Sequence, residues 1–122
     1  MVYTHHARHH IDGKNTLSEN IADLGGLGIA LQSLKDYLRI HYITDPEVIK
    51  KEYKTFFCAY ATSWRTKIPT VKLIHSLGAD PHAPPELRVN LIVAQFDEWY
   101  AAFDIDAKSP MFIEPQDRIR IF

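Results

Sequence analysis

Apolar side chains recur at spacings of three and four residues along the first long stretch of the chain, between Thr16 and His41. This spacing is typical of one face of an amphipathic helix. Its members are Ile21, Leu24, Leu27, Leu31, Leu34 and Leu38. Thr16 and Glu19 have the T-x-x-E form of a capping box, which predicts that the helix begins there. Because the pattern fades near His41, we expect the helix to end at that residue.

Further helices are predicted downstream. Asp45 followed by Pro46 indicates the start of a second helix, which we expect to reach Arg65. Its broad apolar face comprises Val48, Tyr53, Phe56, Phe57, Tyr60 and Trp64. A shorter helix is expected over residues 70–77, and helical patterns return from Glu86 and over residues 96–103. Three prolines exclude residues 80–85 from a helix interior. Residues 119–122 are interpreted as a short strand, so the predicted class is mainly α with little or no sheet.

Composition narrows the class of protein. The 122 residues fit one domain with a modest core, and 46% hydrophobic with 24% charged residues is ordinary for a globular chain. The net charge is −1 and no cluster of Lys and Arg resembles a phosphate-binding surface, so no nucleic-acid partner is expected. No apolar run has the length of a membrane span or the form of a signal peptide, so no membrane segment is expected.

The cysteine and the histidines suggest little chemistry of their own. Cys58 is the single cysteine, which excludes an internal disulfide, and its aromatic neighbours predict a buried, inert thiol. The pairs His5/His9 and His6/His10 have the spacing of an H-E-x-x-H motif but lack its Glu. Residues 1–15 are therefore interpreted as an exposed, His-rich lead-in, followed by one domain over residues 16–122.

Two carboxylates near the start of the first predicted helix are the strongest local signal. Glu19 and Asp23 project from one face of a helix, where like charges repel, so we expect a cation beside them. Gly25, Gly26 and Gly28 follow, and such residues favour close approach of another backbone or a bound ion. The spacing alone leaves two interpretations open. Glu19 either folds back onto Thr16 as a capping box or binds a metal ion.

Residues 19–26, ENIADLGG, resemble a segment of the neprilysin-like zinc metallopeptidases, the family of neprilysin, endothelin-converting enzyme and bacterial oligopeptidase O. The resemblance implies that Glu19 is the third zinc ligand and that Asp23 orients a zinc-binding His. These roles suit the known chemistry, because a catalytic zinc commonly takes three protein ligands and ligand imidazoles need carboxylate partners.

Residues 80–90, DPHAPPELRVN, resemble the D-x-H-x-P-x-x-x-R-V segment of the same family. The resemblance implies that His82 stabilises the oxyanion of the reaction and that Arg88 holds a substrate carbonyl. A preorganised donor at a developing oxyanion contributes several kcal/mol, and Arg presents a fixed fork of donors. The alternative is a solvent-exposed loop His with a surface Arg.

The resemblance extends from about Gly13 to Phe122 and includes the aromatic helix and Ser109-Pro110-Met111. It implies a few-helix segment of a thermolysin-like (zincin) catalytic domain. Leu91-Ile92 stands where family members carry Gly-Pro, so the path after Arg88 is expected to differ. These 122 residues contain no H-E-x-x-H, so two zinc ligands and the general base are expected from chain preceding residue 1.

The sequence therefore predicts the C-terminal portion of a zinc metalloendopeptidase that cleaves small peptides. The parent is expected to be prokaryotic and either cytoplasmic or secreted, with zinc bound only once the N-terminal remainder of the domain is present. Alone, the chain is expected to be inactive and to self-associate through apolar helix faces. The alternative is a non-catalytic helical interaction module derived from such a peptidase.

Overall fold

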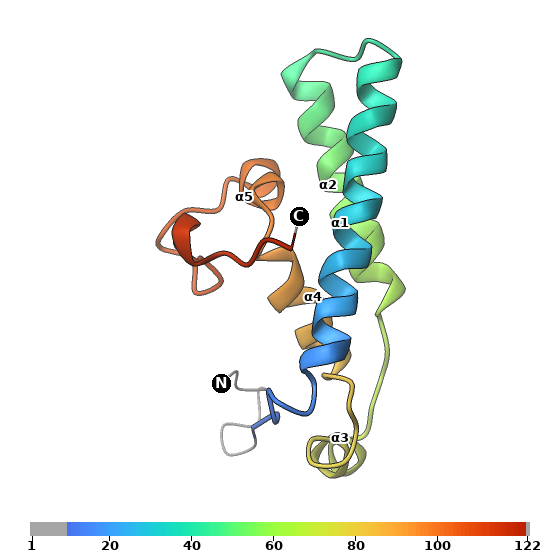
Figure 1. The fold of residues 1–122 in the computed structure, drawn as a ribbon, viewed down its shortest axis with the longest axis vertical. Coiled ribbons are helices and arrows are strands. Elements are labelled where there is room, and N and C mark those ends of the chain that lie inside the picture. Colours follow the sequence, from blue (N-terminus) through green and yellow to red (C-terminus); the bar gives the residue numbers. More distant parts are fainter. Residues whose placement is uncertain (1–9, 122) are drawn as a thin grey trace.

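A computed structural model of the chain describes residues 10–121, and its regular elements are helices (Figure 1). They are α1 (Leu17–Ile40), α2 (Pro46–Ser63), α3 (Thr70–Ser76), α4 (Pro85–Val93), α5 (Asp97–Phe103) and the 3-10 helix η1 (Pro115–Asp117). No β-strand occurs in this described part, which confirms the mainly α class. None of these helices is long and apolar enough to cross a membrane.

The two longest helices, α1 and α2, run in opposite directions and are joined by a turn at the top of Figure 1. Helix α4 packs on α1 and α2, while α5 packs on α2. The short helix α3 lies at the base of the view, in the connection that leads from α2 to α4 (Figure 1). The loop after α3 therefore returns to the lower end of α1, where the predicted site residues lie.

The start of α2 follows its sequence signal. The Asp45 carboxylate accepts a hydrogen bond from the Glu47 backbone N–H at 2.9 Å, and Pro46 occupies the first helical position. Proline is tolerated there because the first backbone N–H groups of a helix have no intrahelical partner. The predicted boundary at Asp45 is confirmed.

The start of α1 is also confirmed, but the predicted capping box is wrong. Thr16 has helical dihedral angles, and its side chain makes no cap hydrogen bond. Its backbone N–H and its hydroxyl both donate to the Asp12 carbonyl, at 3.1 and 3.2 Å. Because the Thr16 N–H already donates to Asp12, it does not donate to the Glu19 carboxylate as a capping box requires. The Glu19 carboxylate is therefore available for other contacts.

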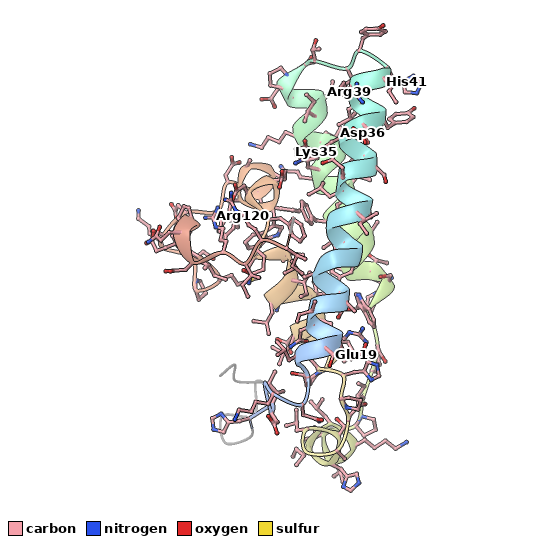
Figure 2. All side chains as sticks on the ribbon, viewed as in Figure 1. Glu19, Lys35, Asp36, Arg39, His41 and Arg120 are labelled. Atoms are coloured by element: carbon pink, nitrogen blue, oxygen red, sulfur yellow. The ribbon has the colours of Figure 1, made fainter. Side chains whose placement is uncertain are left out.

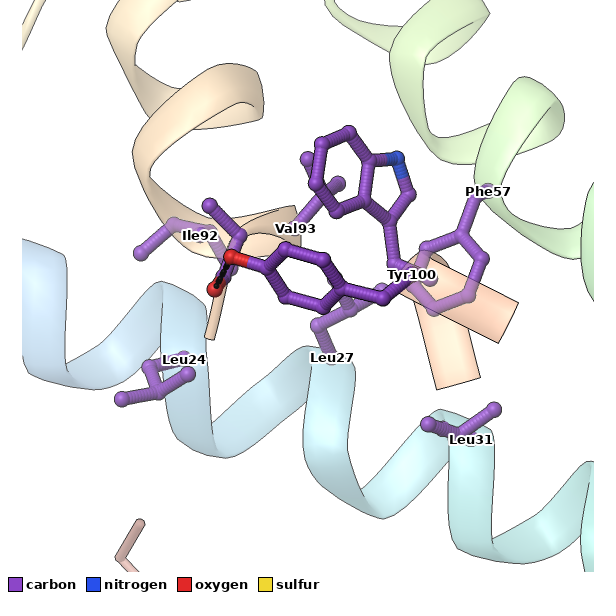
Figure 3. Packing of buried hydrophobic residues seen from close by; sticks show 9 residues of the cluster. Leu24, Leu27, Leu31, Phe57, Ile92, Val93 and Tyr100 are labelled. Carbon is purple, nitrogen blue, oxygen red and sulfur yellow. Dashed lines mark hydrogen bonds between the residues drawn. The ribbon is translucent and has the colours of Figure 1, made fainter. Parts of the chain in front are cut away.

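The main core lies where α1, α2, α4 and α5 meet (Figure 3). Its buried members are Leu24, Leu27, Leu31, Phe57, Ile92, Val93, Ala94, Trp99 and Tyr100. The Tyr100 hydroxyl donates to the Ala94 carbonyl at 2.7 Å and accepts from the Ile113 N–H at 3.0 Å. This phenol therefore joins the end of α4 to the tail that follows α5.

A second, smaller core joins the segment before α1 to the end of α3 and the start of α4. Its buried members are Ile11, Leu77, Ala83 and Leu87, and Leu91 packs against them. Helix α4 continues without a break past Arg88 to Val93, so Leu91 and Ile92 extend the helix and supply both cores. This second core fixes the loop of residues 78–84 against the segment that precedes α1.

Two other sequence expectations, the buried Cys58 and the C-terminal strand, are wrong. Cys58 is exposed, because Phe57 occupies the inward position on that turn of α2. At Gly26, one of the three glycines of α1, a Cβ atom would meet nothing within 4 Å, so no other backbone lies close at this position. Ile119 to Ile121 form no strand; the Ile119 N–H donates to the Gln95 side chain at 2.7 Å instead of a neighbouring strand. Residue 122 lies outside the described residues.

Replacing Tyr100 with Phe should destabilise the chain by about 1–3 kcal/mol, because the buried Ala94 carbonyl would lose its hydrogen-bond donor. Tyr53→Phe is the matched control, since the described residues give its partly buried hydroxyl no hydrogen bond. It should change stability by less than about 0.5 kcal/mol. Urea unfolding of the three proteins measures both values, and equal losses would contradict the role given to the Tyr100 hydroxyl.

Candidate active-site segment

The four predicted site residues come from three parts of the fold and meet at the lower end of α1. Glu19, labelled in Figure 2, and Asp23 lie one turn apart in α1. His82 lies in the loop before α4, and Arg88 lies within α4. The structure brings Asp23 together with Arg88 and Glu19 together with His82.

Asp23 and Arg88 form a two-point ion pair. Arg88 Nε donates to Asp23 Oδ2 and Arg88 Nη2 to Asp23 Oδ1, both at 2.7 Å. The side chains are only 14% and 11% exposed, so water screens the pair weakly. This geometry uses the planar fork of Arg fully. Arg88 is therefore the cation that the carboxylate pair predicted.

The last turn of α2 and Trp64, the residue that follows it, support Arg88 from two further directions. The Arg88 guanidinium carbon lies 3.9 Å from the centre of the Trp64 ring, which is a cation–π contact. The Tyr60 hydroxyl donates to the Arg88 carbonyl at 2.8 Å. The Asp23 hydrogen bond raises the pKa of Arg88, and the charge of Glu19 acts in the same direction. Arg88 is thus held in one orientation as a permanent cation.

His82 lies between two carboxylates. Its Nε2 is 3.4 Å from Glu19 Oε2, and its Nδ1 is 2.9 Å from Asp80 Oδ1. The His82 backbone N–H also donates to Asp80 Oδ1 at 2.9 Å. The hydrogen bonds from the His82 backbone and ring lower the pKa of Asp80. His82 and Glu19 are 45% and 40% exposed at their side chains, so an incoming group can reach both.

The donor set for a metal ion is incomplete within residues 10–121. No group of three or more His, Cys, Asp or Glu side chains in this part of the chain could hold a metal ion. Glu19 is an accessible carboxylate of the kind that zinc binds, so the segment can supply one ligand of three. His5, His6 and His9 of the His-rich lead-in lie outside the described residues.

Four further residues contact the predicted site residues or their loop: Asp80, Tyr60, Trp64 and Asn15. The sequence analysis assigned none of them a role at the site. One signal was present, because an Asp two residues before a His can accept the backbone N–H of that His in a turn. The contacts of Tyr60 and Trp64 with Arg88 join separate helices. Spacing within one helix could not have revealed them.

Comparisons with known proteins place this segment in a family of peptidases. The model of Peptidase family M13 matches residues 1–119, and neprilysin and endothelin-converting enzyme relatives are among the matches. The chain belongs to peptidase family M13, which confirms the resemblance seen in the sequence.

The relatives are much longer proteins. The neutral endopeptidase of Lactobacillus helveticus is 36% identical over 92% of this chain and 16% of its own length. Human endothelin-converting enzyme-like 1 is 36% identical over 83% of this chain and 13% of its own length. A cryo-EM structure of the Mycobacterium tuberculosis zinc metalloprotease Zmp1 matches 93% of this chain and 17% of that chain, with TM-score 0.79 and 38% identity. The chain thus spans about a sixth of the proteins it resembles.

The Asp23–Arg88 pair should be strongly coupled in a double-mutant cycle. Asp23→Ala, Arg88→Ala and the double variant should give a coupling of about 2–4 kcal/mol, because each single change leaves a mostly buried charge without its partner. Urea unfolding of the wild-type chain and the three variants gives the free energies of unfolding from which the coupling is calculated.

The exposed Lys50–Asp104 pair, with the same 2.7 Å separation, is the matched control. Its coupling should be clearly smaller, because solvent screens both side chains. Equal couplings in the two cycles would contradict a special structural role for Asp23 and Arg88.

Proposed function

We propose that this chain is part of the catalytic domain of a zinc metalloendopeptidase that cleaves small peptides. The observation that carries the proposal is the juxtaposition of the Glu19–His82 and Asp23–Arg88 pairs at one end of α1. Family membership supports the reaction class. The bacterial neutral endopeptidases among the relatives support a prokaryotic parent.

Glu19 would be the zinc ligand that the segment contributes. Its carboxylate is half-exposed, and among residues 10–121 its one ion-pair contact is the long 3.4 Å contact with His82. Asp23 would accept the N–H of a ligand imidazole. Although each Asp23 oxygen already accepts from Arg88, a carboxylate has about four acceptor positions and can take another donor. Zinc bound at Glu19 would polarise a substrate carbonyl and activate water.

His82 would stabilise the negative charge that develops on the substrate carbonyl oxygen. A doubly protonated imidazole donates from both nitrogens, so Nδ1 can bind Asp80 while Nε2 faces the reacting group. Arg88 would hold a second substrate carbonyl. Its Nε and Nη2 donate to Asp23, so the N–H groups of Nη1 would donate to the peptide carbonyl.

The remaining zinc ligands, the general base and further peptide-binding groups would come from the N-terminal remainder of the catalytic domain. One carboxylate cannot hold a catalytic zinc, because such sites use three protein ligands. The 122-residue chain by itself should therefore be inactive and bind no tight zinc. Stoichiometric zinc in a preparation with His5, His6, His9 and His10 replaced by Ala would contradict this statement.

In the parent peptidase, Glu19→Gln should remove most of the zinc, because a neutral amide is a poor substitute for a carboxylate ligand. Zinc content measured by atomic absorption checks the change. His82→Ala is the counterpart: it should retain zinc and lower kcat by roughly 10²- to 10³-fold, the usual effect of losing an oxyanion donor. Normal zinc in the first variant, or normal kcat in the second, would refute the corresponding role.

The outer face of α1 would dock against the rest of the domain. Ile29 and Ile40 lie on the side of α1 opposite the buried leucines and are 62% and 61% exposed, which leaves apolar surface on that side. The same exposure favours the second candidate function, a non-catalytic helical interaction module.

The isolated chain should therefore self-associate, and Ile29→Lys with Ile40→Lys should weaken the association because both changes place charge on the exposed apolar face. Sedimentation velocity over a concentration series measures the effect. Val71→Lys is the control, since Val71 is 79% exposed but lies on α3. A monomeric wild-type chain would contradict the prediction.

A further inference from the structure

We propose that Asn15 is a positioning residue for His82, and this inference rests on the oxyanion role proposed above. Asn15 Nδ2 donates to the backbone carbonyl of Asp80 at 3.1 Å. The two residues are 65 positions apart in the chain, and His82 follows Asp80 by two residues. One amide thus connects the segment before α1 to the loop that carries His82.

Asn15 can perform this role because its own position is fixed. The Asp12 carboxylate accepts from the backbone N–H groups of Lys14 and Asn15, at 2.9 and 3.3 Å. The next residue, Thr16, is 2% exposed and binds the Asp12 carbonyl through both its N–H and its hydroxyl. Helix α1 begins directly afterwards and carries Glu19. The Asn15 amide is therefore tied to the same rigid turn as Glu19.

The other end of the connection leads to the imidazole. The Asp80 carbonyl accepts from Asn15, while the Asp80 carboxylate contacts both the backbone N–H and Nδ1 of His82. Fixing the Asp80 peptide thus limits the directions in which its carboxylate, and with it the His82 ring, can turn. Nε2 is left facing Glu19 at 3.4 Å.

Apolar packing alone does not determine this direction. Ile11 contributes to the small core with Leu77, Ala83 and Leu87, which brings the loop close to the segment before α1. Apolar contacts are non-directional, however, and leave the orientation of the Asp80 carbonyl free. A directional hydrogen bond removes that freedom, and catalytic groups must be held within about 0.5 Å of their working geometry.

The test uses the 122-residue chain and NMR. In Asn15→Ala, water exchange at the His82 amide should rise about twofold to fivefold, the effect of losing one exposed hydrogen bond. The ring ¹⁵N shifts of His82 should move toward those of Asp80→Ala, in which the imidazole has lost its carboxylate partner. Circular dichroism and thermal unfolding verify that each variant folds.

Asn20→Ala is the matched control. The Asn20 amide donates to Thr16 Oγ1 at 3.1 Å, so this change removes a similar hydrogen bond that does not reach the loop. It should leave the His82 signals unchanged. Unaltered His82 signals in Asn15→Ala, or equal shifts in both variants, would overturn the inference. If Asn15→Ala unfolds the chain, Asn15→Asp, which loses the donor but keeps the shape, decides with the same readouts.

Kinetics of the parent peptidase separates this inference from the function on which it rests. Asn15→Ala should lower kcat more than it raises KM, and in the His82→Ala background it should have no further effect on kcat. Normal kcat in His82→Ala would refute the oxyanion role even where the NMR shifts support positioning. A loss in Asn15→Ala that persists fully in the His82→Ala background would refute positioning through His82.

Discussion

The ion pair of Asp23 with Arg88 is the contact on which the arrangement of this segment depends. It joins α1 to α4 with two hydrogen bonds at 2.7 Å, and both side chains are largely removed from water. Loss of either partner would leave the other charge mostly buried and unpaired, which destabilises the fold. Because α4 begins directly after the loop that carries His82, the pair also fixes where this loop ends relative to α1.

The pair also resolves the repulsion between the two carboxylates of α1. Asp23 is neutralised by Arg88 in a mostly buried setting, and Glu19 faces His82 in a half-exposed one. The two carboxylates thus differ in environment although they lie one turn apart on the same helix. A carboxylate that is accessible and loosely engaged suits metal ligation, whereas one that is held at both oxygens suits orientation of a neighbour.

Sequence reasoning predicted the helices well, because apolar spacing and the Asp45-Pro46 signal are local properties. It failed where two local options competed: Thr16 binds Asp12 instead of Glu19, and Phe57 instead of Cys58 faces the core. It predicted a cation near Asp23 but could not identify Arg88 from spacing, since the two residues are 65 positions apart. Long-range pairing depends on how α4 packs on α1, which no periodicity encodes.

The two polar pairs and the apolar core occupy different parts of the fold, and this separation bears on how the segment would act in a larger domain. Leu24, Leu27 and Leu31 bury one side of α1 within the segment, whereas Ile29 and Ile40 leave the outer side apolar and exposed. Within the segment, the Asp80 carboxylate holds His82, the Asn15 amide holds the Asp80 carbonyl, and Glu19 contacts His82. In the proposed enzyme, the rest of the domain would therefore dock on the outer face without rearranging these residues, so little conformational entropy would be lost on assembly.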